Sequence, residues 1–284
     1  MNLPSTVTLR EMKPGFPVVH VSHLLGSGSV ALLGAHVMEW TPAGHQPVLF
    51  MSADAVFEEG QPIRGGIPVC WPWFGGRDGL PGHGFARLRF WELARATDSA
   101  EGVELEFRLH GSEAPGWPHA FELSLVVKMG STLDVTLEMK HLGTSTVEIT
   151  AALHTYLSVA AIEQTCVQGL AGALYVDTID NHQVKRQEGE VIFDREVDRI
   201  YTSEGAVHVL DGASPRTLEV SKSGSRATVV WNPWIEKSKR LTDLPDEAYH
   251  GFLCIEAANA GEDVVRLEPQ ENHRLGQVIR VLEG

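Results

Sequence analysis

The sequence predicts an all-β protein built as an antiparallel sandwich or barrel. Apolar residues alternate with polar ones at the two-residue spacing of a half-buried strand, as in Val103, Leu105 and Phe107. The same alternation recurs over 121–129 and 133–139, and the short Gly130-Ser131 link between them indicates a hairpin. No segment holds a helical period, which argues against a parallel α/β sheet.

Further strands are expected wherever short apolar or alternating runs lie between Gly, Pro, Asn or Asp residues. These runs follow one another at roughly ten-residue spacing along the chain, as in sandwiches and barrels. No change of composition along the chain indicates a linker, so a single domain over 1–284 is expected. The predicted strands besides the three above are 7–12, 17–22, 30–35, 87–93, 147–153, 206–212, 217–224, 227–233, 251–257, 263–269 and 277–283.

Two long loops are expected, over 58–86 and 231–249. The first is rich in Gly and Pro and holds Trp71 and Trp73, and the second is polar and aromatic. Long irregular segments in a compact β domain are usually functional or disordered, and the Trp residues favour ordered loops. From composition alone the first loop is either structural or ligand-binding.

Composition and charge narrow the class of partner. The 284 residues are 43% hydrophobic and 21% charged, which is typical of a globular protein, and the net charge is -14. This charge repels phosphate backbones and anionic lipid, so neither nucleic acid nor a membrane is an expected partner. A small anion can still bind where a few Arg and Lys residues converge.

The cysteines and the chain start predict a cytoplasmic location. Cys70, Cys166 and Cys254 form no C-x-x-C pair, which favours a reducing compartment. The first residues show no basic start followed by an apolar run, and the most apolar stretch, 149–162, is interrupted by polar side chains.

Two polar side chains in apolar strands are candidates for acid–base chemistry. His154 lies in Leu153-His154-Thr155-Tyr156 and Glu256 in Cys254-Ile255-Glu256-Ala257. A buried carboxylate is rare unless it is paired, and an imidazole donates a proton near neutral pH. The alternatives are a hydrogen-bonded core histidine and an outward-facing surface glutamate.

Other charged residues are ambiguous from sequence. Asp198 is either a third polar anchor or a surface partner of the adjacent Arg199. Arg64, Arg87 and Arg89 suit phosphate binding, whereas Lys237 to Arg240 is more typical of a solvated run. The 13 histidines are scattered and form no H-x-H or H-E-x-x-H motif, so no metal site is expected.

Six motifs in order resemble the D-hexose-6-phosphate mutarotases, the glucose-6-phosphate 1-epimerase branch of the aldose 1-epimerase superfamily. The likeness runs from about residue 15 to about residue 280. The motifs are Ile63-Arg64-Gly65-Gly66-Ile67-Pro68 with Cys70-Trp71-Pro72, Gly82-His83-Gly84-Phe85-Ala86-Arg87, Leu153-His154-Thr155-Tyr156, Val197-Asp198-Arg199-Ile200-Tyr201, Val230-Trp231-Asn232-Pro233-Trp234 and Cys254-Ile255-Glu256.

This resemblance implies a galactose-mutarotase-like β-sandwich that interconverts the α and β anomers of a hexose 6-phosphate without a cofactor. By matching position, Glu256 corresponds to the general base and His154 to the general acid. The resemblance also implies that sugar phosphate is bound by the remaining matched residues, which are His83, Asp198, Arg64, Arg87 and Trp234. A monomer is expected.

Two other functions remain open at this point. One is a non-catalytic carbohydrate-binding protein that stacks Trp71, Trp73 and Trp234 on a sugar. The other is an aldose 1-epimerase that acts on an unphosphorylated sugar.

Overall fold

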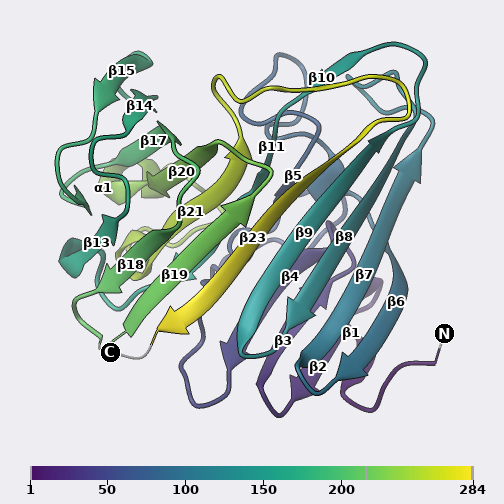
Figure 1. Ribbon diagram of the computed structural model, residues 1–284. Helices are drawn as coiled ribbons and strands as arrows, with labels where there is room; N and C mark the ends of the chain where they lie inside the picture. Colours follow the sequence, from purple (N-terminus) through teal and green to yellow (C-terminus); the bar gives the residue numbers. More distant parts are fainter. Residues whose placement is uncertain (1, 215, 283–284) are drawn as a thin grey trace.

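The largest sheet of the computed structural model has nine strands, and every pair of neighbouring strands in it is antiparallel (Figure 1). The structure describes residues 2–214 and 216–282. In sheet order the strands are β16 (Val191–Ile192), β13 (Thr165–Gln168), β18 (Val207–Asp211), β19 (Arg216–Ser223), β23 (Asn272–Leu282), β9 (Thr132–His141), β8 (Phe121–Met129), β7 (Gly102–Gly111) and β6 (Glu92–Ser99). Buried and accessible side chains alternate along β7, β8 and β9, as the sequence predicts.

A second, eight-stranded sheet carries most of the candidate site. Its order is β15 (Gln183–Arg186), β14 (Leu174–Asp177), β17 (Val197–Thr202), β20 (Ala227–Asn232), β21 (Phe252–Asn259), β11 (Ala151–Leu153) and β5 (Val69–Cys70), and β12 (Tyr156–Ser158) also pairs with β21. All residues of β20 and β21 are buried. Both faces of these two strands are therefore covered, which explains why their sequences are mostly apolar rather than alternating.

The remaining elements are two small sheets and four short helices. The strands are β1 (Val7–Lys13), β2 (Phe16–His23), β3 (Gly26–Ala31) and β4 (His36–Pro42) in one sheet, and β10 (Val147–Ile149) and β22 (Val265–Leu267) in the other. The helices are η1 (Ala86–Leu88), η2 (Ile162–Gln164), α1 (Trp234–Ser238) and η3 (Ala248–Gly251). Within 2–214 and 216–282, no helix has the length and apolar character needed to cross a membrane.

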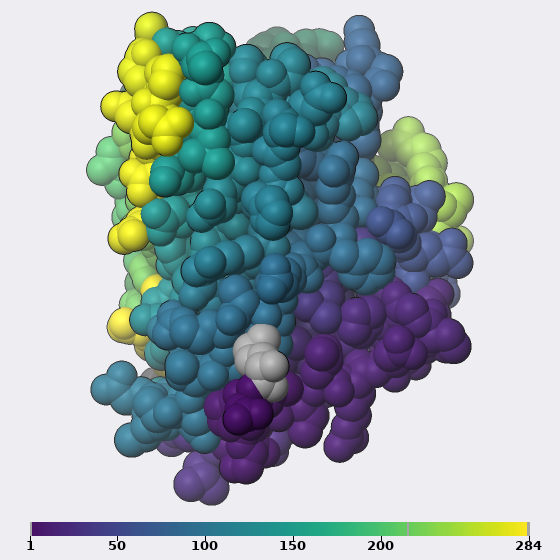
Figure 2. All heavy atoms as spheres, turned by 90° about the vertical axis from the view of Figure 1, so that its right-hand side faces the viewer, coloured from purple at the N-terminus to yellow at the C-terminus, as the bar shows by residue number. Residues whose placement is uncertain are grey.

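Two sheets cover one side of the nine-stranded sheet, and the apolar core lies between the layers. Gln277 of β23 donates a hydrogen bond to the carbonyl of Ile255 in β21, which ties the nine-stranded sheet to the eight-stranded one. Trp40 of β4 donates to the carbonyl of Gly130 in the β8–β9 turn. Figure 2 shows the N-terminal residues, in purple, covering the lower part of one side of the molecule. The predicted all-β antiparallel sandwich is confirmed.

Several segments differ from the sequence prediction. Strands β4, β5 and β13 to β17 lie where no strand was predicted. Over 87–93 the chain forms the end of η1 and only the start of β6. The indole Nε1 of Trp91 donates a hydrogen bond to the carbonyl of Ala86 at the start of η1, which stabilises this turn in place of a strand. The expected loop 231–249 contains α1 and the first half of η3. A helix of five residues is too short to leave a helical period in the sequence. The predicted domain includes residues 1, 215 and 283–284, which lie outside the described residues.

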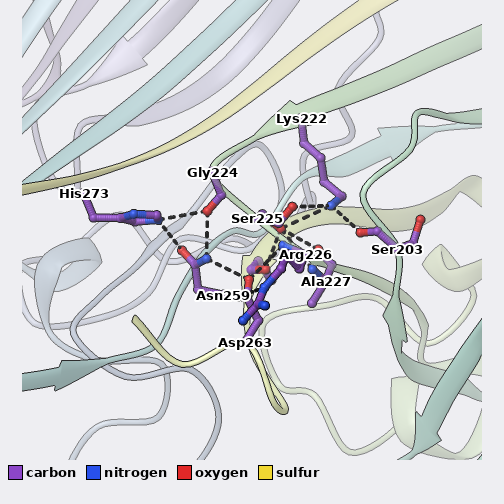
Figure 3. Close-up of polar contacts among 10 residues, drawn as sticks. Ser203, Lys222, Gly224, Ser225, Arg226, Ala227, Asn259, Asp263 and His273 are labelled. Atoms are coloured by element: carbon purple, nitrogen blue, oxygen red, sulfur yellow. Dashed lines mark hydrogen bonds and ion pairs between the residues drawn. The ribbon is translucent and has the colours of Figure 1, made fainter. Parts of the chain in front are cut away.

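A polar network fixes the end of β21 (Figure 3). The side-chain amide of Asn259 donates to the carbonyl of Gly224 and to Asp263, and Asp263 accepts hydrogen bonds from Arg226. The ring of His273 contacts the same Gly224 carbonyl and Asn259. The network holds both ends of the turn that follows β21, and this turn lines the candidate site.

Candidate active site

A cavity of about 520 Å³ lies against the eight-stranded sheet, within the usual size range of small-molecule sites. Alternate residues of β17 and β20, and Glu256 of β21, face it, as expected when one face of a sheet forms the floor. The long 58–86 loop and α1 form part of its wall. The polar lining residues are Arg64, His83, Arg87, Thr150, His154, Thr178, His182, Asp198, Lys237 and Glu256.

Glu256 lies on the cavity face of β21 and is 1% exposed. Its Oε2 atom has no hydrogen-bond partner among the described residues. Burial, reinforced by the negative charge of Asp198, raises the pKa of Glu256 well above its usual range. The carboxyl is therefore held ready to exchange a proton with a ligand in the cavity.

His154 follows β11 and faces Glu256. Its Nε2 atom is 3.4 Å from Oε1 of Glu256, and its Nδ1 atom has no partner among the described residues. The ring is stacked on Tyr156, with centroids 4.9 Å apart, and meets Trp231 edge-on. Burial lowers the pKa of His154 well below 6.5, and the positive charges of Arg87 and Arg64 add to this effect.

The two groups form one coupled acid–base pair. Burial favours the uncharged form of each, so the pair holds a single proton between the carboxyl and the imidazole. Moving that proton across 3.4 Å leaves the net charge of the pair unchanged. The pair can thus present a base and an acid to a ligand at the same time.

His83 enters the cavity from the Gly82–Gly84 turn, where its backbone φ is +60°. Its Nδ1 accepts a hydrogen bond from the backbone N–H of Gly75 at 3.3 Å, so Nε2 carries the proton of the neutral ring. Burial, with the positive charges of Arg87, Arg64 and Lys237, lowers the pKa of His83 to about 3. His83 is therefore a neutral hydrogen-bond donor rather than a second proton source.

Arg64 lines the cavity but is already engaged. Its Nε and Nη2 atoms contact the carboxylate of Asp243 at 3.1 to 3.2 Å, and Nη1 donates to the hydroxyl of Tyr156 at 2.9 Å. A guanidinium has five N–H donors, so two remain for a ligand. Asp243 thus orients Arg64 and offsets much of its charge.

Arg87 is the less committed arginine. Its Nη2 donates to the carbonyl of Gly82 at 2.8 Å, its buried Nε has no partner among the described residues, and it lines the cavity. No ion pair joins it to a carboxylate within 2–214 and 216–282. Arg89 instead lies over the ring of Phe85, and Lys239 pairs with Glu236, both outside the cavity lining.

Asp198 faces the cavity and pairs with a residue far away in sequence. Its Oδ2 is 3.6 Å from Nζ of Lys237, which also contacts Glu196 at 3.1 Å. Burial raises the pKa of Asp198, although the positive charge of Lys237 opposes the shift. A surface ion pair with Arg199 is not formed, because successive residues of β17 face opposite sides of the sheet and Arg199 contacts Tyr201 and Gln187.

The tryptophans are placed differently from the stacking arrangement considered for a sugar-binding protein. Trp71 and Trp73 are 2% and 6% exposed and pack in the core. Trp234 packs against Tyr249 and is not among the cavity-lining residues. Trp231, which lies within the predicted strand 227–233, is the tryptophan that lines the cavity, with Nζ of Lys237 5.8 Å from its ring centroid.

The fold and the site together define a class of protein: antiparallel β-sandwich enzymes with a paired carboxyl and imidazole in a cavity on one sheet face. The family model described as "Aldose 1-epimerase" matches residues 18–280. The chain belongs to the aldose 1-epimerase family, and it is an isomerase.

Similarity to individual proteins extends over nearly the whole chain. A protein of Escherichia coli K12 named "Putative glucose-6-phosphate 1-epimerase" is 37% identical over 98% of this chain and 94% of its own. A crystal structure from Salmonella typhimurium, named as a "putative mutarotase (YeaD)", is 32% identical, with a TM-score of 0.92 over 100% of this chain and 96% of that one. A galactose 1-epimerase from Lactobacillus acidophilus, 14% identical with a TM-score of 0.71 over 100% of both chains, shares the fold.

Proposed function

We propose that this isomerase interconverts the α and β anomers of a hexose 6-phosphate, with glucose-6-phosphate as the first candidate. The observation that carries the proposal is the Glu256–His154 pair, 3.4 Å apart in a cavity that Arg64, Arg87 and Lys237 also line. The names of the relatives in Escherichia coli and Salmonella typhimurium support the same substrate and reaction.

The reaction needs one base and one acid at adjacent oxygens. Glu256, as the carboxylate, accepts the O1 proton while His154 donates its Nε2 proton to the ring oxygen O5. The C1–O5 bond breaks as the O1–H electron pair forms the C1=O1 bond. The aldehyde rotates, O5 attacks the other face of C1, and both protons return. Since O1 and O5 are both bonded to C1, a pair 3.4 Å apart can reach both.

The other cavity residues have proposed roles in holding the sugar phosphate. His83 donates a hydrogen bond from Nε2, and Asp198 accepts hydrogen bonds from sugar hydroxyls. Arg87 and the two remaining N–H groups of Arg64 bind the phosphate, and Lys237 adds positive charge to the same cavity. Binding energy at the phosphate then serves to place C1 between Glu256 and His154.

The pH dependence of the rate follows from the single proton of the pair. At a pH below the lowered pKa of His154, both groups are protonated, so Glu256 cannot accept the O1 proton. At a pH above the raised pKa of Glu256, the pair has lost its shared proton, so His154 has none to donate. A bell-shaped kcat/KM profile is expected, with its acid limb below pH 6.5. Because the charge of Asp198 raises the Glu256 pKa, Asp198→Asn should move the alkaline limb to lower pH.

Glucose is the substrate of choice for this profile, because the phosphate of glucose-6-phosphate titrates near pH 6. Thr150→Val is the matched control, because it also alters a cavity-lining side chain and leaves the charge unchanged, and the Thr150 hydroxyl accepts from the backbone N–H of Phe74 rather than contacting Asp198. An alkaline limb that stays in place or moves up in Asp198→Asn would contradict the coupling between Asp198 and Glu256.

Tyr156→Phe is expected to weaken phosphate binding through Arg64. The substitution keeps the ring stacked on His154 but removes the oxygen that accepts the Arg64 hydrogen bond. A hydrogen bond to a charged group is worth about 1.5–3 kcal/mol. Because Arg64 keeps its contacts with Asp243, the low end of this range is expected, which is a rise of about tenfold in KM for glucose-6-phosphate. Turnover of glucose should stay the same. Tyr201→Phe is the matched control, because Tyr201 is in β17 of the same sheet and its hydroxyl also accepts a hydrogen bond from an arginine, Arg199. An equal change of KM for both sugars would count against this role.

An unphosphorylated aldose is the second candidate substrate. The observation that favours it is that Arg64 and Lys237 are both paired with carboxylates, which reduces the net positive charge of the cavity. Magnetisation-transfer NMR of α/β exchange separates the two candidates. Faster exchange of glucose-6-phosphate than of glucose supports the first, equal acceleration supports the second, and no acceleration of either sugar overturns both.

We further propose that the chain acts as one catalytic unit and as a cytoplasmic monomer. Each large sheet contains strands from distant parts of the chain, and the cavity lining combines the 58–86 loop with β17, β20 and β21. Light scattering after size-exclusion chromatography tests the monomer, and fractionation of cells tests the location.

A further inference from the structure

The proposed reaction leaves one reactive side chain of the site unused. Cys254 lies two residues before Glu256 on β21, so both side chains are on the same face of the strand. A nitrogen of His154, the sulfur of Cys254 and a carboxylate oxygen of Glu256 all lie within 4.8 Å of one another. All three residues are buried, and Cys254 is 0% exposed.

The three donors form a set that suits zinc. Thiolate, imidazole and carboxylate are the ligands that Zn²⁺ takes in proteins, and sites with three protein ligands leave a fourth position open. Tetrahedral Zn–N and Zn–O bonds of about 2.0–2.2 Å place the two ligand atoms about 3.4 Å apart. The separation of His154 Nε2 and Glu256 Oε1 is 3.4 Å.

Charge and hydrogen bonding point to the same ligand. Oε2 of Glu256 is buried and has no partner among the described residues, so the carboxylate has an oxygen available to a cation. Zn²⁺ would displace two protons, one from the Cys254 thiol and one from the Glu256–His154 pair. The product, one Zn²⁺ with a thiolate, a carboxylate and a neutral imidazole, has no net charge, which suits a buried site.

We propose that Cys254, His154 and Glu256 form an inhibitory site for a thiophilic divalent cation, with Zn²⁺ as the type case. The ion enters through the cavity, which His154 and Glu256 line. Cys254, which is buried and does not line the cavity, binds the ion from the protein interior. Its effect is inhibition rather than catalysis, because the ion takes the lone pairs that accept and carry the protons of the reaction. The inhibitory consequence rests on the proposed function, whereas binding of the ion does not.

Binding is tested directly with Cd²⁺, whose thiolate complex absorbs in the ultraviolet by charge transfer. The wild-type protein should develop this absorption with one Cd²⁺ per chain, and Cys254→Ala should not. Cys166→Ala is the matched control, because Cys166 is in β13 of the other large sheet, beside Glu190. Absorption that persists in Cys254→Ala, or none in the wild type, overturns the site.

Inhibition is tested with Zn²⁺ in a chelator-buffered series, with glucose-6-phosphate exchange as the readout. Zn²⁺ should inhibit the wild type and the Cys166→Ala variant, with recovery on adding EDTA. Cys254→Ala and Cys254→Ser should stay active and need about tenfold more Zn²⁺ or higher for the same inhibition. Equal sensitivity of the Cys254 variants and the wild type contradicts the proposal. A protein without exchange activity that still shows the Cys254-dependent Cd²⁺ absorption would keep the site and reject the proposed function.

Discussion

Glu256→Gln is expected to reduce kcat/KM for glucose-6-phosphate by about 10²–10⁴, the usual contribution of a positioned acid or base. The amide has nearly the shape of the carboxyl but accepts no proton from O1. NMR exchange rates measure the loss. Glu219→Gln is the matched control, because Glu219 lies on β19 of the other large sheet and pairs with Arg280 and His208. A Glu256→Gln rate within a few-fold of the wild-type rate would remove Glu256 from the proposed mechanism.

The same substitution should also change how stability depends on pH. Burial raises the Glu256 pKa above its ordinary value of 4.5, so the folded chain holds the proton more tightly than the unfolded chain. The contribution of this group to the free energy of unfolding is complete below pH 4.5 and is lost as pH rises through the raised pKa. Glu256→Gln should therefore gain stability relative to the wild type between pH 5 and pH 8.5, as measured by urea unfolding. A relative loss over that range would contradict the burial argument.

The second large effect is expected for Arg87→Ala. Arg87 lines the cavity, and its buried Nε has no partner among residues 2–214 and 216–282, so its charge is more available to a phosphate than that of Arg64. Loss of a charge-assisted hydrogen bond of about 1.5–3 kcal/mol should raise KM for glucose-6-phosphate by roughly 10- to 150-fold. KM for glucose should change little.

Arg89→Ala is the control for Arg87→Ala. Arg89 is close in sequence but lies over the ring of Phe85 and does not line the cavity. Arg87→Lys, which keeps the charge but loses the planar donor fork, should give an intermediate KM. Parallel losses with both sugars in Arg87→Ala would show that Arg87 supports the Gly82 turn rather than the phosphate.

Much of the fold could be predicted because its strands have one buried face and therefore show the two-residue alternation. This holds for β7, β8 and β9, where the pattern is regular. Strands β13 to β17 were not predicted, because several are short or partly exposed and carry few apolar residues. α1 was missed because five residues give no measurable helical period.

The residues of the site were only partly recognisable from sequence. Glu256 and His154 could be found because a lone polar group in an apolar strand is unusual. Lys237 and Asp243 lie in a polar segment that resembles a solvated loop, and their partners Asp198 and Arg64 are distant in sequence. The alternation rule does, however, separate Asp198 from Arg199, since adjacent strand residues face opposite sides.

The distribution of the site along the chain has a consequence for biosynthesis. The cavity combines the 58–86 loop with β17, β20 and β21, and β21 enters its sheet between β20 and β11. Antiparallel folds with such distant pairings gain their stabilising contacts late, after long loops have closed. During translation the chain must therefore be made to beyond residue 256 before His154 meets its carboxyl partner. A nascent or truncated chain that ends before β21 lacks Glu256, so the proposed mechanism predicts that activity arises in one late step of synthesis rather than by gradual gain.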